Sequence, residues 1–471
     1  MTKYNNFLEQ CSGIIGSDFV SNSNADKQSH LTDWSKRFSG NAIAVLKPKN
    51  VGEVASLVSL CNQNRIPIVP QGGNTGLCGG ATPMDEHPSV VIVTTRLNQI
   101  HEVNLENSTI TLDSGVLLAN AQEAANQSGK LFPLSLASEG SCTIGGNLST
   151  NAGGVQVLRY GNMRDLTLGL EVVTPSGEIF NGLRGLRKDN TGYSLKDIYI
   201  GSEGTLGIIT AATLKLFSLP RSKATALVTL ADIQSSIKLI ELINQHSNTD
   251  LTAFEIMSSS ALTLVSNGIE KLSGLINDHS PWIALIELSS MEDEQKSYAQ
   301  LETLLEKAFD IGLINDAVLS KSLQQSKDLW RIREGIPEAQ FILGTIVKHD
   351  ISLPISELAK FVASTEVKLR KFWPHLQTVI FGHIGDGNLH YNIAPIAPEL
   401  SKDLEIRRKD INQLVHDEVY KFSGSFSAEH GIGQLKRDEL TTRKNSIELE
   451  LMRSIKRALD PHGIMNPGKV L

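Results

Sequence analysis

The segment from Gln71 to Gly80 constrains the fold more than any other stretch of this chain, because five of its ten residues are glycine. Glycine weakens the interior of helices and strands, so the segment is predicted to be a loop with accessible main-chain N–H groups. Such groups bind phosphate oxygens. The loop lacks the Gly-Lys-Ser/Thr ending of a P-loop, and no helix of the right period follows it directly, as a GxGxxG dinucleotide motif would require. Both observations disfavour a nucleotide triphosphatase and a nicotinamide-binding Rossmann domain.

Two more segments share this composition. Pro133–Gln156 mixes glycines with serine, threonine and asparagine, and Ile200–Thr210 is the third such piece. Small hydroxyl and amide side chains donate hydrogen bonds to a pyrophosphate without filling the space around it. One glycine-rich loop alone would be interpreted as an ordinary surface loop. Three such loops joined by short strands indicate one extended ligand, and a large dinucleotide fits that description better than a small phosphate.

A hairpin is predicted over Phe381–Asn392, with the sequence FGHIGDGNLHYN. The Asp-Gly pair at its centre favours a two-residue type I′ turn, because both central positions of that turn need positive φ. This register places His383 directly opposite His390, with Cβ atoms about 5 Å apart. Asn392 shares the face of the two histidines, because it lies two residues beyond His390.

Two facing imidazoles form part of a site for a divalent ion such as zinc, which binds neutral histidine nitrogen atoms at about 2 Å. The segment Ser427–Gly433, SAEHGIG, offers Glu429 as a third ligand, next to His430 and followed by glycines that allow close approach of the main chain. The alternative is that His383 and His390 are ordinary cross-strand neighbours and that Glu429 is solvated. The acid, the additional histidine and the glycines together favour a metal site formed by His383, His390 and Glu429.

The length of 471 residues predicts two or three domains, and a net charge of −7 without a basic block disfavours a nucleic-acid partner. Cys11, Cys61, Cys78 and Cys142 lack the spacing of a disulfide framework, which predicts reduced thiols in a cytoplasmic protein. The amino terminus has neither the apolar core of a secretory signal nor the arginines of a mitochondrial presequence. No apolar run reaches the about 18 residues needed to span a bilayer, so any membrane association is expected to be peripheral.

Six motifs follow one another along the chain: PQGGNTGL (Pro70–Leu77), IGGNLSTNAGG (Ile144–Gly154), GSEGTLGIIT (Gly201–Thr210), GHIGDGNLH (Gly382–His390), SAEHGIG (Ser427–Gly433) and NPGK (Asn466–Lys469). In this order they resemble the vanillyl-alcohol oxidase flavoprotein superfamily. Within it, the chain from about Asp33 onward resembles the FAD-linked D-2-hydroxyacid dehydrogenases. That group includes D-2-hydroxyglutarate dehydrogenase, D-lactate dehydrogenase and the glycolate oxidase D subunit.

The strand–helix alternation after residue 220 predicts an antiparallel sheet with helices on one side. With the resemblance, it gives an α+β fold: a two-part FAD-binding domain of the vanillyl-alcohol oxidase type over residues 1–220, a substrate domain over 221–415, and a helical C-terminal segment over 416–471 that returns to the flavin. FAD is expected to be noncovalent, because some superfamily members attach it through a histidine in the first loop, where this chain has Asn74. The residues implied to hold FAD are Pro70, Gln71, Gly72, Gly73, Asn74, Thr75, Gly76, Leu77, Pro133, Ser138, Gly140, Ser141, Thr143, Gly145, Gly146, Asn151, Gly153, Gly154, Glu203, Gly204, Gly207, Ile209 and Asn466.

The resemblance further implies oxidation of a D-2-hydroxy acid, with D-2-hydroxyglutarate as the first candidate and D-lactate or glycolate as alternatives. The metal ion is expected to acidify the substrate hydroxyl, His430 to remove its proton, and hydride to pass from C2 to flavin N5. Arg333 and Lys348 are implied to contact the substrate carboxylates, and Asn392 to add a neutral contact. Pro337 stands where animal hydroxyglutarate enzymes have threonine, which leaves recognition of the distal carboxylate open.

Reduced flavin needs an electron acceptor, and a quinone or an electron-transfer flavoprotein is expected. Two other classes of protein fit parts of the sequence: a metal-dependent hydrolase, and a flavin-bearing subunit without activity of its own. The presence of all the metal and carboxylate candidates in one chain disfavours the silent subunit. We also allow for a homodimer and for peripheral attachment at the inner face of the membrane.

Overall fold

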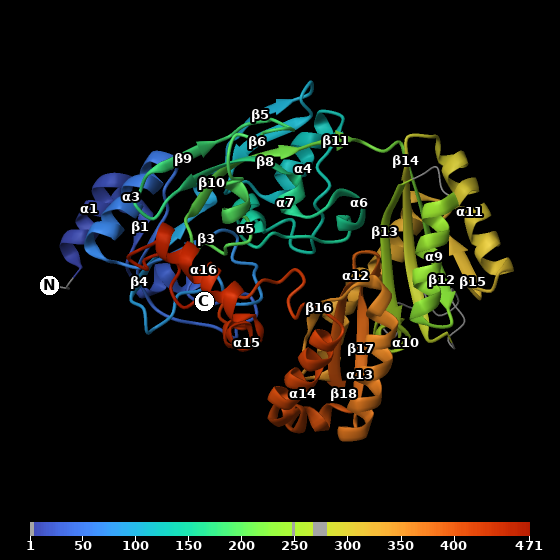
Figure 1. Cartoon of the computed structure of the whole chain (residues 1–471). Helices are drawn as coiled ribbons and strands as arrows, with labels where there is room; N and C mark the ends of the chain where they lie inside the picture. Colours follow the sequence, from blue (N-terminus) through green and yellow to red (C-terminus); the bar gives the residue numbers. More distant parts are fainter. Residues whose placement is uncertain (1–3, 247–249, 267–279) are drawn as a thin grey trace. The chain divides into compact units, whose positions relative to one another are not determined.

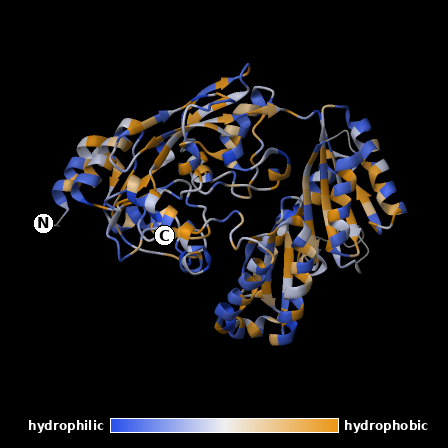
Figure 2. Cartoon of the chain, in the orientation of Figure 1, coloured by the Kyte–Doolittle hydropathy of each residue, from blue (hydrophilic) through white to orange (hydrophobic). Residues whose placement is uncertain are grey.

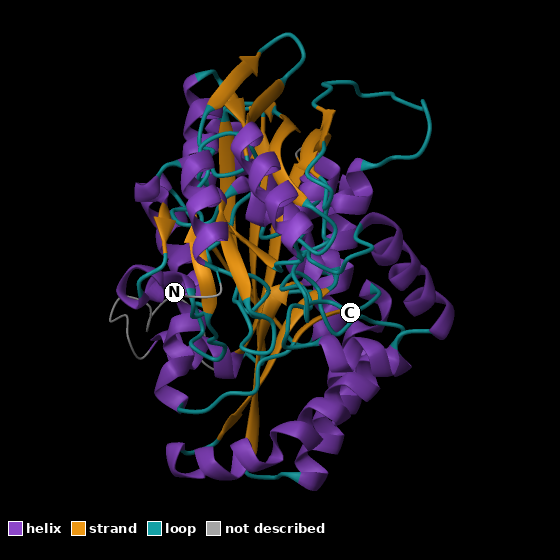
Figure 3. Cartoon of the chain, turned by 90° about the vertical axis from the view of Figure 1, so that its left-hand side faces the viewer, coloured by secondary structure: helices purple, strands orange, loops and turns teal. Residues whose placement is uncertain are grey.

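The computed structural model describes residues 4–246, 250–266 and 280–471, which fall into two compact units. Unit 1 comprises the chain up to Gly153, Gly161–Leu219 and Glu429–Leu471, and unit 2 comprises Gly154–Tyr160 and Pro220–Ala428 (Figure 1). Helices, strands and long connecting loops contribute to the structure throughout the described chain (Figure 3). Neither unit is one continuous segment.

The first sheet of unit 1 has four strands in the order β1-β2-β4-β3, in which β4 pairs in parallel with both β2 and β3. The helix α3 connects β2 to β3. It begins where the Asn50 side chain accepts a hydrogen bond from Glu53 N, and it ends at Arg65 in the left-handed conformation. The first glycine-rich loop starts where β3 ends. The elements are α1 (Asn5–Ile15), β1 (Val20–Ser21), α2 (Asn24–Lys27), β2 (Ala42–Leu46), α3 (Val51–Asn64), β3 (Ile68–Gln71) and β4 (Ser89–Val93).

The second sheet of unit 1 is antiparallel, with the order β5-β6-β10-β8-β9. The elements of this part of unit 1 are β5 (Ile100–Asn104), β6 (Thr109–Asp113), α4 (Leu118–Gln127), β7 (Lys130–Leu131), α5 (Ile144–Ser149), α7 (Met163–Leu166), β8 (Thr167–Val173), β9 (Ile179–Gly182), α8 (Lys196–Tyr199), β10 (Ile208–Lys215) and β11 (Phe217–Ser218). Of these strands, β7 and β11 pair with each other in a separate two-stranded sheet. The central strand β10 follows the third glycine-rich segment, and α5 of the second segment contacts β10. Two of the glycine-rich segments are thereby held at the same sheet.

Unit 2 contains one antiparallel sheet with the strand order β15-β12-β14-β13-β17-β18-β16. Its elements are α6 (Val157–Tyr160), β12 (Ser222–Leu230), α9 (Ile233–His246), β13 (Asp250–Ser258), α10 (Ser259–Ser266), β14 (Trp282–Ser290), α11 (Glu294–Asp310), β15 (Asp316–Leu319), α12 (Leu323–Ala339), β16 (Asp350–Ser352), α13 (Leu358–Phe372), β17 (Leu376–His383), β18 (Asn388–Pro395) and α14 (Ser401–Lys421). The central strand β13 was not predicted from the sequence.

Helices cover both faces of this sheet. On one face, α9, α11, α13 and α14 pack over Phe254 and Ile286, and on the other, α10 and α12 pack over Met257 and Leu285. The predominantly hydrophobic character of the central strands is visible in Figure 2. The expectation of helices on one side was wrong in this respect, because strands such as β14 are buried on both faces and lack the apolar–polar alternation of a half-exposed sheet.

The C-terminal segment of unit 1 contains α15 (Arg437–Arg443) and α16 (Ser446–Leu459). Beyond α16, Met465 forms a bridge with Ile68, and Asn466 N donates to Ile68 O at 2.7 Å. The segment therefore packs beside the strand that precedes the first glycine-rich loop. The helix α14 runs through residue 415, where the sequence analysis placed a boundary, and unit 2 ends at Ala428. The division into functional domains at residues 220 and 415 stays a prediction.

The longest helix of the described chain, α14, has 21 residues and carries charged side chains along its whole length. Across residues 4–246, 250–266 and 280–471, no helix combines the length and apolar character needed to cross a membrane.

The fully buried Tyr391 provides a test of the unit 2 core. Its hydroxyl has no hydrogen-bond partner among the described residues, and its ring packs edge-on against the Phe361 ring with centroids 5.3 Å apart. Because this buried hydroxyl has lost its hydration, we expect Tyr391→Phe to raise the free energy of unfolding by about 1 kcal/mol. Urea unfolding followed by circular dichroism measures the change. Phe361→Leu, which removes a packed ring, should lower the same quantity by about 1 kcal/mol; equal losses in both variants would contradict this account.

Candidate functional site

All three glycine-rich segments line one pocket in unit 1. The pocket contains about 900 Å³ of space, open solvent included. Its lining also includes His430 of the C-terminal segment. The other lining residues are Pro70, Gln71, Gly72, Gly73, Asn74, Thr75, Gly76, Cys78, Gly80, Ala81, Thr94, Cys142, Thr143, Gly145, Gly146, Asn147, Ser149, Thr150, Glu203, Gly204, Gly207, Ile208 and Ile209.

Most residues that the resemblance assigns to FAD lie in this lining, but some do not. Those outside it are Leu77, Pro133, Ser138, Gly140, Ser141, Asn151, Gly153, Gly154 and Asn466. Asn466 has a role within the protein, because its Nδ2 atom donates to Gly80 O at 2.9 Å and to Glu203 O at 2.7 Å. For each of these residues, contact with the cofactor stays a prediction.

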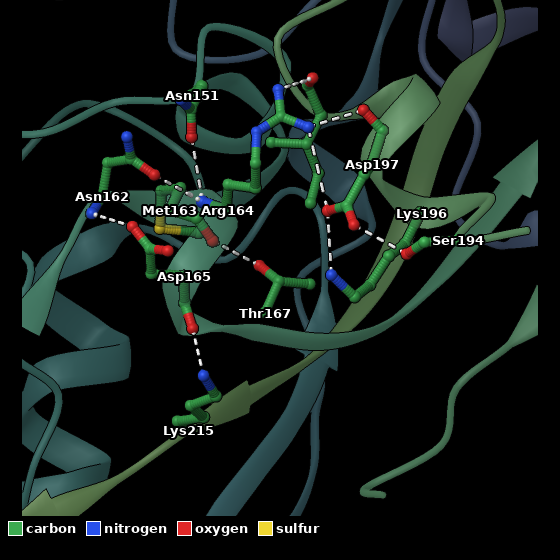
Figure 4. A network of polar contacts seen from close by, with 11 residues as sticks. Asn151, Asn162, Met163, Arg164, Asp165, Thr167, Ser194, Lys196, Asp197 and Lys215 are labelled. Carbon is green, nitrogen blue, oxygen red and sulfur yellow. Dashed lines mark hydrogen bonds and ion pairs between the residues drawn. The ribbon is translucent and has the colours of Figure 1, made fainter. Parts of the chain in front are cut away.

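Asn151 holds the end of the second glycine-rich segment in place. Its Oδ1 atom accepts a hydrogen bond from Arg164 N at 2.9 Å (Figure 4). The Arg164 guanidinium in turn donates to Asp197 O at 2.6 Å and to Ile200 O at 2.7 Å. This network links the second glycine-rich segment, α7 and the chain that leads into the third segment, so it fixes two walls of the pocket relative to each other.

The first and second glycine-rich loops approach so closely that side chains have no room between them. A Cβ atom at Gly73 would overlap Ser141 O, and one at Gly72 would overlap Thr143 Oγ1. Gly73 is therefore required by the close approach of its main chain to that of Ser141, and Gly72 leaves room for the Thr143 hydroxyl.

The polar groups of the pocket fit the dinucleotide cofactor expected from the resemblance. Asn147 Nδ2 is buried and has no hydrogen-bond partner among the described residues, which is a costly state unless a ligand or water accepts the bond. Of the described residues that line the pocket, none is lysine or arginine. A pyrophosphate would consequently be bound by main-chain N–H groups and by neutral hydroxyl and amide donors.

The hairpin of unit 2 has a different register from the predicted one. His390 lies opposite Phe381, and the predicted pair of His383 and His390 does not form. The connection is a 3₁₀ turn over Ile384–Asp386 followed by a glycine in the left-handed conformation, and the Asp386 side chain accepts a hydrogen bond from Asn388 N at 3.1 Å. This longer turn shifts the pairing by two residues, which corrects the prediction of a two-residue loop.

A shift of two residues keeps both histidines on the same face. The rings of His383 and His390 are nearly perpendicular, with centroids 5.9 Å apart. His383 pairs with β13 on its other side, where it lies opposite Glu255, and its Nδ1 atom is 2.5 Å from Glu255 Oε1. A metal ion bound to His383 would therefore use Nε2, with Glu255 fixing the orientation of the ring.

Glu255 is fully buried and also binds Arg333, whose Nε atom donates to Glu255 Oε2 at 2.6 Å. Burial alone would raise the pKa of Glu255, but the charges and hydrogen bonds of His383 and Arg333 outweigh burial and lower that pKa to about 2. The predicted substrate residue Arg333 is thus already part of a buried ion pair. Pro337 lies inside α12 four residues later, and because proline lacks an N–H it leaves the Arg333 carbonyl without its helical hydrogen bond.

The predicted metal ligands lie in both units. In unit 2, Asp350 lies opposite His390, with its Oδ1 atom 4.0 Å from His390 Nδ1. In unit 1, Glu429 lies beside His430, with its Oε1 atom 3.9 Å from His430 Nε2. Histidine nitrogen and carboxylate oxygen atoms fit an ion such as zinc. The ion and its ligand set of His383, His390 and Glu429 stay a proposal.

The two other predicted substrate contacts have different surroundings. Lys348 is exposed, and its Nζ atom lies 5.6 Å from the centroid of the Phe341 ring. Asn392 is buried, donates to Gln340 Oε1 at 2.9 Å and accepts a hydrogen bond from His349 N at 3.3 Å. Both polar ends of Asn392 are used within unit 2, so its contact with substrate stays a prediction.

Sequence reasoning missed Glu255 and Asp350. The signal for Glu255 was present, because a single acid inside the apolar run Leu251–Met257 is typical of a buried strand that needs a partner for its charge. Asp350 had no such signal, since its neighbour His390 lies 40 positions away and only the pairing of β16 with β18 brings them together.

Two family models match this chain. The model for the C-terminal domain of FAD-linked oxidases matches residues 219–470, and a model for an FAD-binding domain matches residues 42–182. The first covers more than half of the chain.

Curated relatives match over nearly the whole chain. A mitochondrial D-2-hydroxyglutarate dehydrogenase of Arabidopsis thaliana is 36% identical over 97% of this chain and 80% of the relative. A D-2-hydroxyglutarate dehydrogenase of Xanthomonas citri is 36% identical over 95% of this chain and 93% of the relative. A putative mitochondrial D-lactate dehydrogenase of Schizosaccharomyces pombe is 38% identical over 94% and 85%, respectively.

Solved structures show the same fold at low sequence identity. p-Cresol methylhydroxylase aligns with a TM-score of 0.76 at 18% identity, covering 100% of this chain and 97% of the other. Alkyldihydroxyacetonephosphate synthase aligns with a TM-score of 0.75 at 18% identity over 99% and 85%. The predicted α+β fold of the vanillyl-alcohol oxidase type is thereby confirmed.

The contact between the glycine-rich loops can be tested with paired substitutions. Gly73→Ala forces a Cβ atom onto Ser141 O, whereas a Cβ atom at Gly140 meets nothing within 4 Å. We expect Gly73→Ala to lose bound flavin, measured as the ratio of absorbance at visible and ultraviolet wavelengths, and Gly140→Ala to keep it. Equal flavin loss in the two variants would show that the packing between the loops is not the cause.

Proposed function

This chain belongs to the family of FAD-linked oxidases, and we propose that it is an FAD-dependent dehydrogenase that oxidises a D-2-hydroxy acid, D-2-hydroxyglutarate above all, to the 2-oxo acid. The observation that carries this proposal is the convergence of three glycine-rich segments and His430 on one pocket. The pocket supplies neutral donors for the cofactor and the side chain of His430, a residue type that serves as general base in many enzymes. Relatives named D-2-hydroxyglutarate dehydrogenase, alike over nearly the whole chain, support the choice of substrate.

In the proposed mechanism, His430 acts as general base on the substrate hydroxyl. FAD, when bound, supplies the acceptor for the hydride that leaves C2. The glycine-rich loops hold the cofactor and keep side chains out of the space that it needs. The proton and the hydride thus leave the substrate separately, and the proton is taken up by an imidazole nitrogen of His430.

The proposal includes a divalent ion, with His383, His390 and Glu429 as its ligands and zinc as the expected element. Such an ion would supply Lewis-acid chemistry that makes the substrate hydroxyl more acidic. Glu255 supports this assignment, because a carboxylate on Nδ1 of a ligating histidine is a common arrangement in metal sites.

Lys348 and Arg333 are the proposed cations for the substrate carboxylates, and Asn392 the proposed neutral contact. A second candidate substrate is a shorter acid such as D-lactate or glycolate. Two observations favour it: Arg333 is already paired with Glu255, and Pro337 offers no hydroxyl for a distal carboxylate. The relative named as a putative D-lactate dehydrogenase is consistent with this candidate.

The electrons must leave through a second partner, for which we propose a quinone or an electron-transfer flavoprotein. The relatives include proteins named mitochondrial and proteins of bacteria, so a cytoplasmic location is a proposal, as are peripheral membrane attachment and a homodimer. A flavin-bearing subunit without activity is disfavoured, because this chain carries a complete set of candidate catalytic side chains.

The substrate is tested by anaerobic titration of the purified protein with D-2-hydroxyglutarate, D-lactate, D-malate and glycolate, with and without a chelator. We expect the visible flavin absorbance to bleach with D-2-hydroxyglutarate and chelation to abolish the bleaching. Bleaching that survives chelation would remove the metal ion from the mechanism, and no bleaching with any acid would favour a silent subunit. A colourless protein with metal-dependent hydrolytic activity would point to the hydrolase.

The role of Lys348 is tested by Lys348→Ala. Loss of one charge-assisted contact to a carboxylate should raise KM for the acid about tenfold or more while flavin stays bound. Arg331→Ala is the matched control, because Arg331 is exposed and, among the described residues, forms an ion pair only with the surface residue Asp328, at 2.9 Å. Steady-state kinetics with an artificial electron acceptor measures both variants, and an unchanged KM in Lys348→Ala would exclude the contact.

A further inference from the structure

The loop that carries His430 is held at the pocket of unit 1 from two sides. On one side it is bound to the first glycine-rich loop, where Gln434 N donates to Cys78 O at 2.8 Å and Gln434 Nε2 donates to Gly79 O at 2.9 Å. These bonds fix the loop beyond its glycines. They do not by themselves fix the residues next to His430.

On the other side, the Glu203 carboxylate binds two consecutive main-chain amides of the same loop. Its Oε1 atom accepts from Ile432 N at 2.7 Å, and its Oε2 atom accepts from Gly433 N at 2.8 Å. Hydrogen bonds to an ionised acceptor are shorter and stronger than those between neutral groups. The amides two and three residues after His430 are therefore attached to Glu203.

Glu203 is itself rigidly placed. Its N–H donates to Ser149 O at 2.8 Å, and its carbonyl accepts from Asn466 Nδ2 at 2.7 Å. Its φ of 51° lies in the left-handed region, which a residue with a side chain adopts only where the surroundings enforce it. The second glycine-rich segment, the third one and the C-terminal segment meet at this residue.

The fit between the carboxylate and the loop leaves no spare room. Gly431 has a φ of +77°, and a Cβ atom there would lie 2.9 Å from Glu203 Oε1. Burial raises the pKa of Glu203 by more than the two amides and Lys436 lower it. Glutamine would fill the same space without a buried charge, but two N–H donors need two acceptor oxygens, and only a carboxylate provides both.

We propose that Glu203 is a positioning residue, which holds the main chain of residues 431–433 so that the His430 imidazole stays where it removes the substrate proton. The inference rests on the proposed role of His430 as general base. It differs from the assignment of Glu203 to the cofactor that the resemblance implies, because both side-chain oxygens of Glu203 are used by the protein itself.

The first test is Glu203→Gln, which keeps the shape and removes one acceptor. We expect kcat to fall about 10- to 100-fold, as for a displaced catalytic group, with KM within about twofold of the original value. Flavin content should stay at one per chain. Loss of flavin in this variant would overturn the proposal in favour of a direct cofactor contact.

Glu171→Gln is the matched control. Glu171 is a buried acid on β8 of the same unit, and its carboxylate accepts from Asn181 Nδ2 and from Thr210 Oγ1, both at 3.0 Å. It does not line the pocket. We expect kcat of Glu171→Gln to be unchanged, and an equal fall in both variants would mean that loss of any buried charge in unit 1 is sufficient.

A double substitution tests whether Glu203 acts through His430. In the His430→Gln background, adding Glu203→Gln should leave kcat at the value of the single His430→Gln variant, because the positioned group is already gone. Fold losses that multiply would overturn the proposal.

A measurement without substrate separates this inference from the proposed function. Hydrogen exchange of the Ile432 and Gly433 amides should be at least about tenfold faster in Glu203→Gln than in the original protein. Unchanged exchange would overturn the positioning role even if activity fell. If no hydroxy acid reduces the flavin of the original protein, the proposed function fails, and the exchange rates still decide whether Glu203 holds the loop.

Discussion

Close packing of one main-chain segment against another, at positions where no side chain fits, is the constraint on which the pocket of unit 1 depends. Gly72 and Gly73 bring the first glycine-rich loop against Ser141 and Thr143 of the second. The pocket walls are therefore made largely of peptide groups and small polar side chains. Such walls can bind a long anionic cofactor through many neutral donors without lysine or arginine. The Asn151–Arg164 network holds the second of these loops to the chain that leads into the third glycine-rich segment.

Two carboxylates organise the side chains proposed for catalysis, one in each unit: the half-buried Glu203 and the fully buried Glu255. In unit 1, Glu203 binds main-chain amides beside His430, and in unit 2, Glu255 binds both His383 and Arg333. A buried carboxylate needs partners, and here the partners are the loop or side chains that carry the chemistry. The hydrogen bonds that stabilise each carboxylate therefore also fix the position of the loop or side chains that donate them. The pairing of Arg333 with Glu255 also bears on substrate choice, because an arginine that already has an anionic partner attracts a second carboxylate less strongly.

Much of the fold could be predicted from patterns within short stretches. The glycine-rich loops and the strand–helix alternation after residue 220 depend on local composition and periodicity, which the sequence displays directly. Other features could not be predicted in this way. The turn after His383 is longer than the two-residue turn that an Asp-Gly pair predicts, and the Asp386 side chain accepts a hydrogen bond within it. The strand β13 lies in the centre of its sheet, although its apolar run contains Glu255.

By itself, the sequence determined the family, the kind of cofactor pocket and the residue types available for a metal ion and a general base. These depend on short motifs and on the order in which they follow one another along the chain. The tertiary structure decided which of those residues meet. It placed His430 in the pocket through Glu203, put His390 opposite Phe381, and joined Arg333 to Glu255 across 78 positions. Pairings of this kind arise when distant strands and loops pack together, and no short stretch of sequence contains both partners.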